Sequence, residues 1–194
     1  MISLASRFKS AAKIISQESS SVSADATIRR LRSDDAASFR VIRLEALKAN
    51  PELLRSTFGE LEDRLDVAWF AGRLEDAHIV GAFRDGELVG TAGFAVQQGQ
   101  PNAHKGRLFG MYVRSSSRNL GVGRLLLSAV LDLARENVEL IQLSVVRENR
   151  PARRLYESVG FLEFGVETKA SKYGDRYYDE ALMALDFGRP ADVS

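Results

Sequence analysis

Hydrophobic and polar positions follow two periods along this chain, and they predict a succession of strands and helices. Some segments show the two-residue alternation of a strand, and others repeat apolar residues every three to four positions, as on one helix face. The expected elements are a strand at 27–32, a helix from Asp34 or Asp35 to Lys48, a helix from Leu61, a hairpin over 78–96 turning at Asp85 and Gly86, a strand at 107–113, a helix after Gly121, a strand at 141–146, a short helix after Asn149, and strands from Phe161 and Arg176. With 194 residues, one domain is expected.

The strand at 107–113 is apolar on both alternating faces, which is typical of a central strand. Strict alternation places Leu108, Gly110 and Tyr112 on one face and Phe109, Met111 and Val113 on the other. Gly110 weakens the middle of this strand, so we expect either a β-bulge or a ligand lying against the backbone.

The turn that follows this strand reads RNLGVGR, from Arg118 to Arg124, and it opens an amphipathic helix. Gly121 and Gly123 have no side chain to block close approach, so backbone N–H groups at the positive helix end can point at an anion. A glycine-rich turn without a ligand is the alternative, because short glycine motifs are weak evidence. Neither the dinucleotide fingerprint nor the P-loop matches, since Leu126 replaces a small residue and no Gly-Lys-Ser/Thr follows.

A second motif, RENRPARRLYESVGF, follows the strand at 141–146. Asn149 is a candidate N-cap, Pro151 suits a first helical turn, and Gly160 suits a helix stop. The apolar residues of the short helix share one face, and they are Ala152, Leu155, Tyr156 and Val159.

The ordered pair of motifs, RxxGxG and NxxAxxLYxxxGF, resembles the GNAT superfamily of acyl-CoA-dependent N-acyltransferases, over roughly residues 27–187. The resemblance implies an α/β (α+β) fold, a mixed sheet of about seven strands splayed between the fourth and fifth, with about four helices. It implies acetyl-CoA as acyl donor and an unidentified small molecule or peptide with a primary amine as acceptor. The residues implied to bind the cofactor are Met111, Tyr112, Val113, Arg118, Asn119, Leu120, Gly121, Val122, Gly123, Arg124 and Asn149.

Amine acylation needs a group that protonates the departing thiolate, and the resemblance gives this role to Tyr156; the alternative is a packing tyrosine. Where some relatives carry a glutamate in the fifth strand, this chain has Ser144, so that base cannot be carried over. Glu60, Glu62, His104 and Asp179 remain candidate bases. The glutamates also suit an ordinary helix N-terminus, and Asp179, in a largely apolar row, needs either a substrate ammonium or a partner within the chain. We expect the acceptor near Glu60, Glu62, Tyr173 and Asp179.

Composition narrows the remaining functions. The 27 basic and 26 acidic residues give no overall field for nucleic acid, and no apolar run is long enough to cross a bilayer. The chain lacks cysteine, which fits a cytoplasmic setting, and its two isolated histidines argue against a metal site. Residues 1–26 and 189–194 read as tails around a domain at 27–188, although the basic, serine-rich N-terminus also suits a transit peptide.

Two other functions stay open: a non-catalytic acyl-CoA-binding or regulatory module, and a phosphate-binding fold that uses nucleotides. Either would use the RNLGVGR turn without acylating an amine. We expect a monomer or a homodimer.

Overall fold

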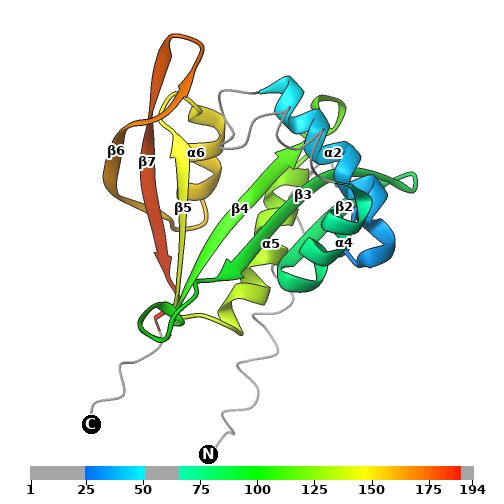
Figure 1. Ribbon diagram of the computed structural model, residues 1–194, viewed down its shortest axis with the longest axis horizontal. Coiled ribbons are helices and arrows are strands. Elements are labelled where there is room, and N and C mark those ends of the chain that lie inside the picture. Colours follow the sequence, from blue (N-terminus) through cyan, green and yellow to red (C-terminus); the bar gives the residue numbers. More distant parts are fainter. Residues whose placement is uncertain (1–24, 51–65, 189–194) are drawn as a thin grey trace, which may run out of the picture.

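A computed structural model describes residues 25–50 and 66–188, and the structural statements below concern those residues. Seven strands form one sheet in the order β1-β2-β3-β4-β5-β7-β6 (Figure 1). Their bounds are β1 Thr27–Arg30, β2 His78–Arg84, β3 Glu87–Val96, β4 Lys105–Val113, β5 Leu140–Val146, β6 Leu162–Tyr173 and β7 Arg176–Asp186. Only the β4–β5 pair is parallel among these strands. The expected mixed sheet of seven strands is confirmed, with β4 at its centre.

Four α-helices accompany the sheet within the described ranges: α2 Ala36–Ala49, α4 Val67–Asp76, α5 Val122–Arg135 and α6 Arg150–Glu157. Three short 3-10 turns complete the set, η2 Ser33–Asp35, η4 Gln100–Asn102 and η5 Ser115–Ser117. Leu61, the expected start of a helix, lies outside the described residues. The helix described after it, α4, begins at Val67, and its N-cap Asp66 accepts a hydrogen bond from the Trp69 amide at 2.9 Å.

Two hydrophobic clusters lie on opposite faces of the sheet. One joins α5 and α6 to β2, β3, β4, β5 and β7, and the apolar stripe of α5 is buried in it. The other joins α2 and α4 to the opposite face of β2, β3 and β4 (Figure 1). Strands β2, β3 and β4 are therefore covered on both sides, and the two faces of β4 meet different helices.

A local signal in the sequence specifies the turn between β2 and β3. Asp85 and Gly86 both have positive φ, 50° and 81°, as the expected type I′ turn between β2 and β3 requires. His78, at the start of β2, stacks on Phe94 with ring centroids 4.7 Å apart and has a packing role there.

A β-bulge interrupts β4. On β3, Thr91 pairs with Tyr112 and Gly93 pairs with Phe109. Two residues of β4, Gly110 and Met111, therefore lie opposite the single β3 residue Ala92. Gly110 has φ 68°, and the buried Thr91 hydroxyl donates to its carbonyl oxygen at 3.0 Å. Of the two alternatives expected for Gly110, the bulge is therefore observed; a ligand against this backbone stays a prediction.

The expected alternation along this strand is wrong beyond Gly110, because the extra residue of the bulge exchanges the two faces. Tyr112 packs in the cluster of α2 and α4, whereas Leu108, Met111 and Val113 pack in the cluster of α5. Tyr112 therefore shares a face with Phe109 and not with Leu108.

The parallel strands β4 and β5 separate after a short contact. Their pairing covers only three positions, from Lys105 with Leu140 to Arg107 with Gln142. Beyond this point β4 continues beside β3 and β5 continues beside β7, so the two strands diverge (Figure 1). The splay expected between the fourth and fifth strands is confirmed, and it leaves the β5-facing edge of β4 unpaired.

Candidate active site

The RNLGVGR turn forms the N-terminus of α5. Gly121 is the N-cap, with φ 80° and ψ −5°, a left-handed conformation that glycine adopts without strain. The first amides to donate within the helix belong to Arg124 and Leu125, both to the Gly121 carbonyl. In the described chain, the amides of Val122 and Gly123 have no such acceptor, and they lie at the positive end of the helix dipole. The turn is therefore suited to hold an anion.

Two arginines flank these free amides. The Arg118 Nε donates to the Val113 carbonyl at 2.9 Å, and its guanidinium lies 5.8 Å from the Tyr112 ring centroid. This bond draws Arg118 over the end of β4 and leaves its terminal nitrogens available. Arg124 is exposed on the first turn of α5. Neither arginine takes part in an ion pair with the described residues, so both charges can face a phosphate.

A cavity of about 700 Å³ extends from this turn into the opening between β4 and β5. Its wall includes Met111 and Val113, from the α5 face of β4, and Phe109, Gly110 and Tyr112, from the α2 face. The cavity therefore reaches both sides of the sheet through the gap between the splayed strands. Such a passage allows two molecules to meet from opposite faces.

Nine of the eleven residues expected to contact the cofactor line this cavity. They are Met111, Tyr112, Val113, Arg118, Asn119, Gly121, Gly123, Arg124 and Asn149. The side chains of Leu120 and Val122 pack against the hydrophobic core instead, so only their backbone is placed to meet a ligand. Their side chains do not line the cavity.

The second motif forms the opposite wall. Asn149 caps α6 through its Oδ1, which accepts from the Ala152 amide at 3.3 Å, and this leaves the Asn149 amide nitrogen free to donate. Gly160 ends the helix region with φ 101°, as its position predicts. The two motifs, far apart in sequence, therefore face one another across the cavity.

Tyr156 lies on α6, is 6% exposed, and packs edge-on against Phe161. It also lines the cavity, so its ring belongs both to the core and to the site. Burial raises the pKa of its hydroxyl from 10.0 to about 12, because the charged tyrosinate is poorly solvated there. The group therefore holds its proton at neutral pH and can donate it.

The two candidate bases that the structure describes, Asp179 and His104, lie away from the cavity. Asp179 does not line the cavity, and its Oδ1 accepts from the Lys169 amide at 2.9 Å, which gives this carboxylate a partner within the chain. His104 precedes β4 at the end where β4 and β5 still pair, and its carbonyl accepts from the Glu139 and Leu140 amides. Glu60 and Glu62 lie outside the described residues. The role of each carboxylate stays a prediction.

Sequence reasoning missed a polar group on the α2 face. The Tyr112 hydroxyl donates to Glu45 Oε1 at 3.1 Å, and Arg114 Nε donates to Glu45 Oε2 at 2.9 Å. Burial raises the pKa of Tyr112, and the neighbouring carboxylate adds to this effect. Arg43 was also missed, although its position supplied a signal: it is four residues from both Phe39 and Leu47, which are buried.

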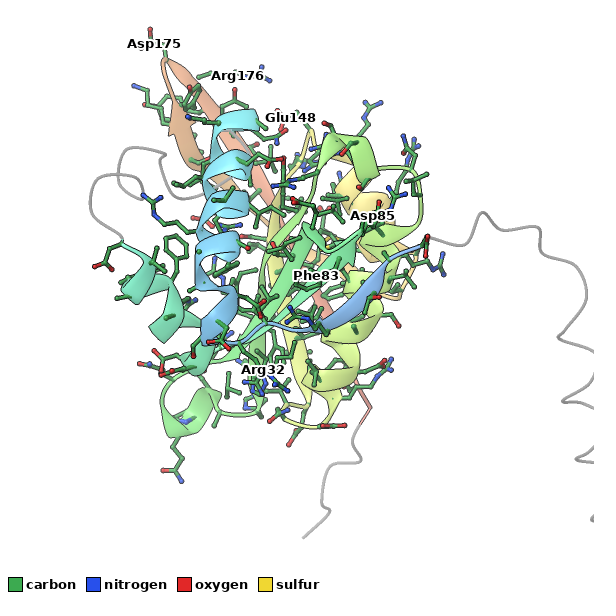
Figure 2. The ribbon with its side chains drawn as sticks, turned by 90° about the vertical axis from the view of Figure 1, so that its right-hand side faces the viewer. Arg32, Phe83, Asp85, Glu148, Asp175 and Arg176 are labelled. Atoms are coloured by element: carbon green, nitrogen blue, oxygen red, sulfur yellow. The ribbon has the colours of Figure 1, made fainter. Side chains whose placement is uncertain are left out.

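The hairpin between β6 and β7 contacts the loop after β5. Arg176 Nη2 lies 3.5 Å from Glu148 Oε1, which links the hairpin tip to the loop after β5. Figure 2 shows Glu148, Asp175 and Arg176 at the end of the molecule where α2 also ends. Tyr173, expected near the acceptor, is 53% exposed just before this tip.

Within 25–50 and 66–188, no group of three or more His, Asp or Glu side chains is arranged to hold a metal ion. No helix in the same ranges is long and apolar enough to cross a bilayer.

Comparison with known proteins agrees with the geometry. Mycothiol acetyltransferase of Sanguibacter keddieii is 30% identical over 145 residues, which is 73% of this chain and 45% of that protein. The chain thus spans less than half the length of this relative. N-alpha-acetyltransferase RimI of Mycobacterium tuberculosis is 34% identical over 119 residues, covering 59% of this chain and 69% of that protein.

The fold has close counterparts among solved structures. The acetyltransferase yncA of Salmonella typhimurium, solved with its cofactor acetyl-CoA, superposes with a TM-score of 0.75 at 22% identity, over 87% of this chain and 98% of that one. Residues 42–161, more than half of the chain, match the model of the Acetyltransferase (GNAT) family. The chain therefore belongs to the GNAT family of acetyltransferases.

Proposed function

We propose that this protein transfers an acetyl group from acetyl-CoA to a primary amine. The observation that carries the proposal is that one cavity is lined both by Gly121 and Gly123 of the RNLGVGR turn and by the buried Tyr156. When bound, acetyl-CoA supplies an activated thioester carbonyl. Every other requirement of the reaction falls to the protein: orientation, exclusion of water and movement of protons.

Residues of this chain would contact acetyl-CoA from its diphosphate to its thioester and so orient it. The amides of Val122 and Gly123, with Arg118 and Arg124, would hold the diphosphate, because both dipole and side-chain charge favour an anion there. The unpaired edge of β4 at Met111–Val113 would bind the pantetheine amides as a further strand would. The Asn149 amide nitrogen lies on the same wall and would fix the arm near the thioester.

Tyr156 would protonate the departing thiolate. Its raised pKa keeps the hydroxyl neutral throughout the physiological range, so the proton is present when the carbon–sulfur bond breaks. No described Asp, Glu or His side chain lines the cavity, and Ser144 is too weak a base to replace them. Glu60 and Glu62 remain the proposed bases.

The amine's own pKa bears on the choice of acceptor. An α-amine with a pKa near 8 is about one-tenth neutral at pH 7, whereas a lysine amine near 10.4 is neutral in roughly one molecule per few thousand. An acceptor with a weakly basic amine therefore needs the least help from the protein. Mycothiol acetyltransferase and the α-amine enzyme RimI are relatives whose acceptors we would test first.

The test is to incubate the protein with acetyl-CoA and a panel of small-molecule and peptide amines and to measure free thiol. We expect release that depends on at least one amine. Tight coenzyme binding without release for any amine would instead support the non-catalytic module, which Ser144 in the fifth strand favours. Stabilisation of the fold by ATP or NAD but not by CoA would support the nucleotide-binding alternative.

A further inference from the structure

Arg43 on α2 carries a guanidinium that the described chain does not neutralise. Arg43 is four residues from both Phe39 and Leu47, so it lies on the helix face that these buried residues occupy, and it is only partly exposed. Its Nη1 atom is fully buried and has no hydrogen-bond partner. A buried charged nitrogen without a partner is costly, so such an atom in a folded protein calls for an explanation.

A second arginine lies close to the first. The Arg73 guanidinium, from α4, sits 4.9 Å from the centroid of the Phe109 ring and forms no ion pair within the described ranges. Burial lowers the pKa of Arg43, and the nearby positive charge of Arg73 lowers it further. Two neighbouring like charges repel each other, and this repulsion is relieved when an anion binds between or beside them.

The carboxylate on the same helix does not relieve this charge. Glu45 already accepts from both Arg114 and Tyr112, at 2.9 and 3.1 Å. It is therefore engaged with other partners and leaves the two guanidinium groups for a ligand.

Neither arginine lines the cavity between β4 and β5, but each lies next to a residue that does. Phe109, the ring beneath Arg73, and Gly110 both line that cavity. A methyl group placed on Gly110 would lie 3.6 Å from Arg43 Nη1, in ordinary contact and with no other side chain between them. The missing side chain at Gly110 thus leaves the Arg43 guanidinium next to the passage, on the face away from the RNLGVGR turn.

We propose that Arg43 and Arg73 bind an anionic group of the acceptor, so that the acceptor is a primary amine that also carries a carboxylate or a similar oxyanion. The inference rests on the proposed acetyl transfer. A guanidinium presents parallel N–H groups that match a carboxylate in a two-bonded fork, and desolvation strengthens such a pair. With its anion held on the α2 face, the amine would reach through the passage toward the thioester.

The experiment compares amine acceptors that differ only in this charge. Each of the common L-amino acids is offered beside its carboxamide, and kcat and KM are measured by thiol release from acetyl-CoA. Removing the carboxylate lowers the pKa of the adjacent amine and makes more of it neutral, so chemistry alone favours the carboxamide. We expect the opposite: for the best acceptor, kcat/KM is at least about tenfold higher with the free carboxylate.

Variants then assign the effect to the two arginines. In Arg43→Gln the KM of the carboxylate acceptor should rise at least about tenfold, while the KM values of its carboxamide and of acetyl-CoA stay within about twofold. Arg73→Gln should act in the same direction with a smaller change, because Arg43, and not Arg73, has a fully buried nitrogen without a partner. Arg43→Lys should restore part of the loss, since it keeps the charge but not the fork. Arg135→Gln, on the last turn of α5 and paired with Asp132, is the matched control and should change neither acceptor.

Equal use of carboxylates and carboxamides by the unaltered protein would overturn the inference, as would an equal loss for both in Arg43→Gln. Calorimetric titration of the same carboxylates into the protein saturated with CoA tests the site without turnover. Binding that Arg43→Gln abolishes supports the anion site even if no amine is acetylated, in which case the proposed activity alone is wrong. Absence of binding, or binding that Arg43→Gln leaves unchanged, contradicts the site.

Discussion

The two faces of β4 contribute to one cavity but are built differently. On the α5 face, the proposed donor side is made largely of main chain, namely the amides before Arg124 and the unpaired edge of β4, to which α6 adds the side chain of its cap Asn149. On the α2 face, the proposed acceptor side is made of charged and aromatic side chains, above all Arg43, Arg73 and Tyr112. A backbone site recognises a shape that many proteins can share, whereas a side-chain site can change its ligand by substitution. Selectivity for the acceptor should therefore reside on the α2 face.

The largest expected effect separates catalysis from binding on the donor face. Tyr156→Phe removes the proposed acid and keeps the ring, so we expect kcat to fall at least about a hundredfold while the Kd of acetyl-CoA changes little. Steady-state kinetics and calorimetry measure the two quantities. Tyr177→Phe, a 51% exposed tyrosine that does not line the cavity, is the control. Full activity of Tyr156→Phe across the pH range would remove the acid role.

The same tyrosine makes a prediction for stability in alkali. The folded protein holds the Tyr156 proton up to a pH of about 12, whereas an unfolded tyrosine releases it near its usual pKa of 10.0. This contribution to stability is therefore complete below pH 10 and is lost between pH 10 and 12, by roughly 3 kcal/mol in all. Chemical denaturation at several pH values should show that Tyr156→Phe loses less stability over this interval than the unaltered protein. Parallel losses in both proteins would contradict the burial of this hydroxyl.

A glycine exchange tests the main-chain character of the donor face. Gly121→Val should weaken CoA binding by about thirtyfold, because the branched side chain strains a residue at φ 80° and covers the amides that follow it. Gly174→Val is the matched control, since Gly174 also has positive φ, 58°, but stands in open space and does not line the cavity. Both variants should lose stability, and only the first should lose affinity. Unchanged CoA affinity in Gly121→Val would remove the phosphate role of the turn.

The smallest predicted effect concerns the bulge that joins the two faces. Thr91→Val deletes the hydroxyl that donates to the Gly110 carbonyl and should lower the free energy of unfolding by about 1 kcal/mol. Because the bulge positions Gly110 beside Arg43 and Met111 toward α5, we also expect a modest rise in KM for both substrates. Thr91→Ser keeps the donor and should keep both KM values. A rise for acetyl-CoA alone would show that the bulge serves only the donor face.

The sequence allowed prediction of features that depend on local signals. Asp85 and Gly86 fixed a hairpin, Asn149 and Gly160 bounded α6, and the glycine spacing at 121 and 123 located the turn, because each requires a particular conformation at a particular residue. The position of β7 between β5 and β6 follows from contacts between distant segments, and no local pattern specifies it.

The α2 face was harder to predict. Strict alternation placed Tyr112 with Leu108, because a bulge at Gly110 was only one of two alternatives and its consequence for the residues that follow was not drawn. Arg43 was overlooked because one arginine barely disturbs an amphipathic pattern, although its spacing from Phe39 and Leu47 put it on the buried stripe. A charge on the apolar face of a helix is the signal that would have found it.

The most direct measurement of the central claim is a crystal structure with bound acetyl-CoA. Our account predicts the diphosphate within hydrogen-bonding distance of the Val122 and Gly123 amides, the pantetheine along Met111–Val113, and the sulfur beside the Tyr156 hydroxyl. Coenzyme bound elsewhere, with the opening between β4 and β5 left without it, would contradict the account.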